Sequence, residues 1–375
     1  MCSYSINANE RGAIVGGNVV LGADASLDAV AGFRGAGQGE STFHGNLLGH
    51  ALWQKTPASS QAIGWKAYAS VLWVEGRGPT ACFLGDYLTA DNVEAYNGLR
   101  LYSWWLEAGQ GCWSVRAGAL LADEEFACTT SGAELLNSAF GWPAFISANT
   151  TNTGPAYYAA ALGARVAFQG ESGWSWQAGV YDGDSFDSPF GDDRPNRHGT
   201  HFQLNGGQGA FFITEAGYAP GAANYSFHVG AWSHTADFTD LNGVDRHSGN
   251  YGAYVIAERT LAGQVGQPGN IQAHVRAGLA PDDRNEIAWS VDTAVAATGC
   301  WARRPADIVT LGFVHAGLSS RLTEQDHEQV VELTYAASLN DHLTLKPDLQ
   351  YILHTGGTPQ GADSLLFILR LSASF

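Results

Sequence analysis

Residues 365–375 place an apolar side chain at every odd position. The even positions carry Arg370, Ser372 and Ser374, together with Leu366 and Ile368. Successive side chains of a β-strand point to opposite faces, so this strand has one apolar face and one mostly polar face. In a closed sheet every backbone hydrogen bond is made, and such a strand then faces lipid on one side and water on the other. The segment therefore predicts a membrane β-barrel.

Upstream segments repeat the pattern. In residues 343–354 the odd positions are apolar or aromatic, whereas the even positions include Lys346 and Asp348. Residues 330–339 and 271–277 alternate in the same way. A lysine on the lipid face near the membrane midplane costs about 2–4 kcal/mol, so Lys346 is expected to face the lumen. The same parity argument predicts four lumen-lining residues, namely Arg276, Lys346, Asp348 and Arg370.

The composition agrees with a chain of short strands. Charged residues make up 15% of the sequence and 47 of the 375 residues are Gly. No apolar run approaches the roughly 18–20 residues that a membrane helix needs. A soluble β-sandwich also alternates apolar and polar residues, so a soluble all-β protein is the alternative that periodicity leaves open.

We therefore predict an all-β fold, a single transmembrane antiparallel β-barrel formed by residues 1–375, with residues 1–17 leading into it. At about 23 residues per strand and connection, the length corresponds to about 16 strands, an even number as in bacterial single-chain barrels. Periplasmic turns are expected to be short and extracellular loops long. Long connections, extracellular or folded inward, are expected near residues 121–160, 182–208 and 237–250.

The net charge limits the kinds of partner that we expect, and the cysteine count limits the possible disulfide bonds. The formal net charge of −17 argues against nucleic acid and anionic membrane surfaces, because both need a basic footprint. Five cysteines are an odd number for a chain that matures in an oxidising compartment, so at least one lacks a partner within the chain. A bridge between Cys112 and Cys128 is conceivable, but spacing does not settle the pairing. The cysteines are Cys2, Cys82, Cys112, Cys128 and Cys300.

The amino-terminal residues bear on processing. Residues 1–11 lack the apolar core of a secretory signal peptide, so the chain is expected to be a mature form. Cys2 raises the possibility of a lipid-modified terminus. An ordinary near-terminal cysteine is the favoured interpretation, because the apolar stretch that lipid attachment requires is missing.

Nine short motifs, in order along the chain, resemble segments of the OprB-type carbohydrate-selective porins. They are LRLY (99–102), VRAG (115–118), DEEF (123–126), LNSAFG (136–141), QAGVYDGD (177–184), GTHF (199–202), EAGY (215–218), GLAPDDRN (278–285) and LKPDLQYI (345–352). The resemblance runs over about residues 99–375 and is looser before them. Ser103 departs from the family pattern, in which a glutamate is expected.

The resemblance implies a function. It implies passive diffusion of glucose and related neutral sugars across the bacterial outer membrane, through a monomeric barrel of about 16 strands. Such a channel contacts outer-membrane lipid and lipopolysaccharide and needs no cofactor. A structural barrel that binds another envelope protein is the alternative. An outer-membrane enzyme is the third hypothesis, and the sequence shows no nucleophile, base and orienting group to support it.

Charged side chains are expected at the constriction, where they replace the water that a sugar loses. Arg116 and Arg165 each stand between apolar neighbours, so both should enter the lumen. A purely structural ion pair is the alternative role for each residue. The predicted constriction and sugar-binding residues are Arg100, Arg116, Asp123, Glu124, Glu125 and Arg165. Four aromatic residues of the 121–160 connection either face the sugar or pack within the loop, namely Trp142, Phe145, Tyr157 and Tyr158.

Two further groups invite metal chemistry. Asp182, Asp184 and Asp187 supply oxygen ligands for calcium, but their spacing differs from that of the twelve-residue calcium loop. An acidic extracellular loop is therefore the favoured interpretation. His198 and His201 lie in a Gly-rich segment without an evident third ligand, and we expect no metal there.

Overall fold

The computed structural model describes residues 13–15, 18–55, 62–188, 191–221 and 224–375. Cys2 and most of the predicted amino-terminal segment lie outside these residues. Of the helices in the described ranges, none combines the length and apolar character needed to cross a membrane.

The regular secondary structure of the described chain is almost entirely β-strand. The short strand β1 (Ala13–Val15) pairs with the beginning of β2. The remaining strands are β2 (Val19–Arg34), β3 (Ser41–Lys55), β4 (Gly64–Gly76), β5 (Gly98–Gln110), β6 (Trp113–Leu120), β7 (Ala161–Gln169), β8 (Trp174–Asp182), β9 (Ala210–Tyr218), β10 (Tyr225–Thr239), β11 (Arg246–Ala262), β12 (Ile271–Leu279), β13 (Ile287–Thr298), β14 (Ile308–Leu318), β15 (His327–Ser338), β16 (Leu343–Leu353) and β17 (Ser364–Ser374).

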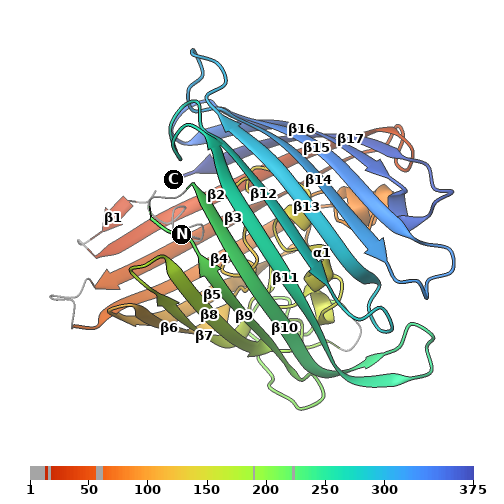
Figure 1. The fold of residues 1–375 in the computed structure, drawn as a ribbon, viewed down its shortest axis with the longest axis horizontal. Helices are drawn as coiled ribbons and strands as arrows, with labels where there is room; N and C mark the ends of the chain where they lie inside the picture. The colour runs from red at the N-terminus through yellow and green to blue at the C-terminus, as the bar shows by residue number, and fades with distance from the viewer. Residues whose placement is uncertain (1–12, 16–17, 56–61, 189–190, 222–223) are drawn as a thin grey trace.

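These strands close into a ring. Each strand from β2 to β17 pairs antiparallel with the next, and β17 returns to pair with β2 through partners such as Arg370 and Asp28. Of seventeen strands, β1 lies outside the ring, so sixteen form the barrel. Figure 1 shows the tilted strands surrounding the connection that carries α1 (Ala144–Ser147). The predicted all-β barrel of about 16 strands is confirmed.

Side-chain parity follows the prediction. On β17, Leu371 is exposed on the outer surface, whereas Ile368 and Arg370 are buried inside. Exposed apolar residues occur all around the outer face, for example Leu27 on β2 and Val229 on β10. A sheet that is apolar outside and closed on itself suits a hydrocarbon environment, because no backbone edge faces lipid.

The apolar core lies within the ring rather than between two sheets. Inward residues of the wall, including Val330 and Ile368, pack against Leu136 and Phe140 of the connection 121–160. That connection includes η3 (Ser138–Phe140), α1 and η4 (Thr151–Thr153). The connection 77–97 also folds inward and contains η2 (Thr80–Leu84). A soluble sandwich would instead bury an apolar layer between stacked sheets.

We call the barrel end with the connections 77–97, 121–160 and 183–209 the loop end, and the opposite end the turn end. The long connections expected near 121–160 and 182–208 are present. The prediction of a long connection near residues 237–250 is wrong, because β10 and β11 remain paired up to Thr239 and Arg246. The polar residues there continue a hydrogen-bonded ladder beyond a bulge. The 77–97 connection was not predicted.

The cysteine bridge considered between Cys112 and Cys128 is not formed. No disulfide joins any two of the four described cysteines. Cys112 lies in the tight turn between β5 and β6, at the turn end, whereas Cys128 belongs to the inward-folded connection 121–160. Residues that bracket a strand and its loop lie a strand length apart, which is too far for a disulfide.

Candidate functional site

Three charged side chains form a row across the inner wall. Glu107 on β5 is the cross-strand partner of Arg116 on β6, and Arg116 is the partner of Arg165 on β7. All three point inward because each alternates with outward-facing neighbours, as Arg116 does with the exposed Val115. Glu125, from the inward connection, completes a group that we call the charged quartet.

Each arginine of the charged quartet contacts both glutamates. Arg116 Nε donates to Glu107 Oε2 at 3.0 Å, and its Nη1 donates to Glu125. Arg165 Nη2 donates to Glu107 Oε2 at 3.0 Å, and its Nε donates to Glu125 Oε2 at 2.5 Å. The Arg116 guanidinium also lies 3.9 Å from the centroid of the Trp105 ring. The quartet is therefore buried, charge-balanced and rigidly held.

Sequence reasoning identified three members of the charged quartet and missed the fourth. Arg116, Arg165 and Glu125 were predicted and lie together. Glu107 was not predicted, although it stands between Leu106 and Ala108, the same apolar–charged–apolar pattern that identified Arg116. Its two immediate neighbours are the only local signal for Glu107, because strict alternation over residues 98–110 would put Arg100 and Glu107 on opposite faces. Both face inward because the register of β5 shifts between them.

Asp123 and Glu124 lie next to the quartet but outside its ion pairs. Asp123 Oδ2 accepts a hydrogen bond from the backbone N–H of Tyr157 at 2.9 Å. Both carboxyl groups belong to the inward connection, between β6 and β7. Burial raises the pKa of Glu124 to about 8, and the neighbouring charge of Asp123 acts in the same direction. Burial likewise raises the pKa of Asp123 to about 6.

Arg100 lies apart from the quartet, nearer the loop end. Its Nη2 donates to the backbone oxygen of Asn196 at 3.3 Å, and its guanidinium lies 4.7 Å from the ring centroid of Tyr158. Its Nε and Nη1 make no hydrogen bond with any described residue. Buried N–H groups without partners are uncommon, so these two donors remain available for hydrogen bonding. Arg100 is buried behind the Tyr158 ring and does not itself line either cavity.

Tyr158 lines the larger of two cavities. This cavity, about 1120 Å³ at the loop end, also contacts Tyr96, Trp142, Tyr157 and Phe186. The Tyr158 ring centroid lies 5.9 Å from that of Tyr96 and 5.7 Å from that of Phe186. We call these five residues the aromatic wall. They present large apolar ring surfaces beside polar groups.

The four aromatic residues of the 121–160 connection fall into two groups. Trp142, Tyr157 and Tyr158 line the large cavity, whereas Phe145 is buried against Tyr254. A second cavity, of about 530 Å³, lies at the turn end, with charged residues that include Lys66 and Glu107. The quartet thus adjoins the turn-end cavity, because Glu107 belongs to both.

The other predicted lumen residues face the interior but mainly hold the inward connections. Arg276 pairs with Asp292 and donates to four backbone oxygens, those of Ala127, Ala139, Phe140 and Gly141. Arg370 binds Asp28 and Asp91.

Of the remaining two predicted lumen residues, Lys346 also contacts an inward connection, whereas Asp348 is bonded to the neighbouring wall strand β15. Lys346 pairs with Glu134 of the inward connection at 2.7 Å. Asp348 is buried and accepts a hydrogen bond from the Thr334 hydroxyl at 2.6 Å. Neither these two residues nor Arg276 and Arg370 line the two cavities described above.

The acidic segment considered for calcium is held by protein donors. Asp184 accepts hydrogen bonds from the Asn152 side chain and from the backbone N–H groups of Phe186 and Ser188. Gln208 donates to Asp187. Among the described residues, the groups whose carboxylate and imidazole atoms converge do not include Asp182, Asp184 or Asp187.

Comparisons with known proteins agree with the fold and identify the family. A model of the carbohydrate-selective porin, OprB family, matches residues 11–375. The high-pH structure of Pseudomonas putida OprB aligns with a TM-score of 0.81 and 16% identity, over 96% of this chain and 94% of that chain. Its low-pH structure aligns with a TM-score of 0.55 and 14% identity, over 96% and 93%.

A mutant of the Rh. blastica porin aligns with a TM-score of 0.57 and 12% identity, over 95% of this chain and all of that chain. Comparison with curated protein sequences gave no match. At these identities the structural neighbours establish the barrel fold, while the family model covers nearly the whole chain. The chain belongs to the OprB family of carbohydrate-selective porins.

Proposed function

We propose that the aromatic wall receives a neutral sugar such as glucose and that Arg100 binds its hydroxyl groups on the way through the lumen. The observation that carries this proposal is the pair of unused Arg100 donors, Nε and Nη1, beside the Tyr158 ring. A sugar has both parts that this site complements, since its hydroxyls accept hydrogen bonds and its C–H face packs on aromatic rings.

The charged quartet then narrows the path toward the turn end. Its donors are occupied by carboxylates, so it shapes the passage more than it binds sugar. Two arginines and two glutamates sum to zero formal charge, and a sugar carries no net charge itself, so its passage past the quartet depends on shape and hydrogen bonding rather than on Coulombic attraction. Weak binding at Arg100 and little binding at the quartet suit a channel, because a solute held tightly does not leave.

We further infer the setting of the barrel. Exposed apolar residues on β2, β6, β10, β14 and β17 support contact with outer-membrane lipid around the whole wall, as for a monomer. The loop end, with its long connections, is assigned to the cell exterior, where its rim meets lipopolysaccharide, and the turn end to the periplasm.

The test is sugar block of ion conductance through the purified protein in planar bilayers. Glucose is expected to lower the conductance, and Arg100→Met to raise the half-blocking concentration. Removing hydrogen bonds worth about 0.5–1.5 kcal/mol corresponds to a change of roughly two- to twelvefold. Arg34→Met is the matched control, because Arg34 is exposed at the rim and contacts Tyr351. Equal block in wild type and Arg100→Met would overturn this role of Arg100, and an absence of conductance would favour a scaffolding barrel.

A further inference from the structure

The outer face of the barrel carries a group of two imidazoles and one carboxylate at the loop end. Asp326 ends the connection between β14 and β15, His327 begins β15, and His354 follows β16. His327 alternates with the buried Glu328, so its side chain points away from the lumen. The group is separate from both cavities and from every residue of the charged quartet.

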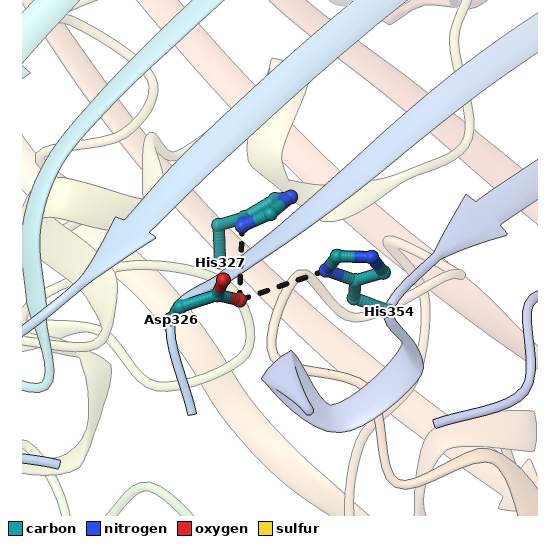
Figure 2. A group of neighbouring side chains, drawn as sticks. All are labelled: Asp326, His327 and His354. Atoms are coloured by element: carbon teal, nitrogen blue, oxygen red, sulfur yellow. Dashed lines mark ion pairs between the residues drawn. The ribbon is translucent and has the colours of Figure 1, made fainter. Parts of the chain in front are cut away.

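The three side chains converge on one point (Figure 2). His327 Nδ1 lies 2.9 Å from Asp326 Oδ1, and His354 Nδ1 lies 3.6 Å from the same oxygen. One ligand atom from each residue lies within 4.8 Å of the other two. The two imidazole centroids are 4.3 Å apart. His354 Nδ1 is shielded from solvent yet makes no hydrogen bond with a described residue.

The surrounding backbone and rings fix this arrangement. His354 adopts a left-handed conformation with φ of 53° and ψ of 49°, which is strained for a residue with a β-carbon. Its backbone N–H donates to Asp363, and the N–H of Asp326 donates to the oxygen of Gly357. His315 stacks on the His327 ring with centroids 5.1 Å apart. The ligand atoms are therefore pre-positioned rather than carried on free side chains.

Two other groups of histidine and aspartate differ in charge. In the group of Asp240, His247 and Asp283, Arg321 contacts both oxygens of Asp240 at 3.1 Å. In the group of Asp28, His44 and Asp91, Arg370 contacts both carboxylates. Arg321 and Arg284 balance the two carboxylates of the first group, and Arg370 offsets one of the two negative charges of the second. A guanidinium in contact with the carboxylates repels a metal cation. Within the described ranges, by contrast, Asp326 forms ion pairs with His327 and His354 alone.

We propose that Asp326, His327 and His354 bind a divalent transition metal ion of the zinc type. Neutral imidazole nitrogen and carboxylate oxygen are ligands that Zn²⁺ accepts, at about 2.0–2.2 Å each, so tetrahedral ligand atoms lie roughly 3.3–3.5 Å apart. The observed 2.9 and 3.6 Å require only small side-chain adjustments. All three residues keep part of their surface exposed, which leaves the fourth position to water or to an external anion.

The experiment is calorimetric titration of ZnCl₂ into tag-free, chelator-treated protein in detergent at pH 7.5. One saturable zinc site per chain is expected. His354→Ala and His327→Ala should each weaken binding by at least about tenfold, since even residues supporting a metal ligand contribute that much. His342→Ala is the matched control, because His342 is exposed at the turn end and contacts the backbone oxygen of Ser374. It should bind zinc like the wild type.

Two outcomes would overturn the proposal. One is the absence of saturable zinc binding, which would leave the group as a plain ion-pair cluster. The other is binding that persists in both His327→Ala and His354→Ala but disappears in His247→Ala, which would place the metal at Asp240 and Asp283. Circular dichroism and heat-dependent electrophoretic mobility would verify that each variant remains a folded barrel.

Discussion

The guanidinium groups of Arg116 and Arg165 each contact both Glu107 and Glu125, so the charge of the lumen at this level depends on all four residues. Removing one partner from a buried pair leaves an uncompensated charge. Replacing one residue of the quartet is therefore expected to change the ion selectivity of the channel rather than to remove one sugar contact.

Arg116→Met should make the channel more selective for cations. The substitution keeps much of the side-chain bulk and changes the formal charge of the quartet from zero to −1. Reversal potentials in a KCl gradient measure the effect. Arg303→Met removes the same charge from an exposed position in the turn between β13 and β14 and should leave the reversal potential almost unchanged. Equal shifts in both variants would contradict this role of the quartet.

Glu124 should make selectivity depend on pH. Its pKa is raised to about 8, so the side chain is largely protonated at pH 6 and ionised at pH 9. Cation selectivity should therefore rise over this range, and Glu124→Gln should remove most of the rise. Because the folded-state pKa lies above the ordinary value of 4.5, the contribution of Glu124 to stability is present below pH 4.5 and is lost as pH rises through 8. An unchanged pH profile in Glu124→Gln would contradict the assignment.

At the scale of elements, the connection 121–160 gives the interior its shape, and Arg276 fixes it to β12. Arg276 is fully buried and its donors bridge Asp292 on the wall and four backbone oxygens of the connection. These hydrogen bonds provide donors for backbone oxygens that would otherwise be unpaired inside the barrel. The same element supplies Glu125 and most of the aromatic wall.

Arg276→Met should loosen this connection without opening the barrel. Losing one partner of a buried ion pair costs about 3–5 kcal/mol of stability. The same substitution removes the hydrogen bonds that Arg276 donates to backbone oxygens within residues 127–141. Hydrogen–deuterium exchange should become faster in those residues, and single-channel current should become noisier. Arg246→Met, at the exposed start of β11, is the control. Protection of residues 127–141 equal to the wild type would rule out the anchoring role.

Elements also show what a sequence pattern can predict. The alternation of side chains along each strand predicts that four arginines face inward, because a charge on the lipid face is costly. They are Arg116, Arg165, Arg276 and Arg370. The same alternation does not specify which loop covers a side chain, so Arg276 was expected to line the lumen and instead holds a loop. Contacts such as that between Arg276 and Ala127 join distant parts of the sequence, and local alternation carries no information about them.

For the whole molecule, closure between β17 and β2 turns sixteen strands into a wall with an apolar outer face and a loop-filled interior. As a member of the OprB family, the protein is a sugar channel of the bacterial outer membrane, and porins are channels rather than enzymes. Strand number and facing were predictable from length and parity. The inward position of the connection 77–97 was not, because its packing against the wall depends on the closed ring.

Liposome swelling tests the central account, a water-filled lumen that passes neutral sugars. Liposomes containing the purified protein are transferred to isotonic glucose or to a disaccharide such as maltose, and the fall in turbidity is followed. The account predicts rapid swelling in glucose, slower swelling in the larger sugar, and none in protein-free liposomes. Swelling in glucose no faster than that of protein-free liposomes would contradict it.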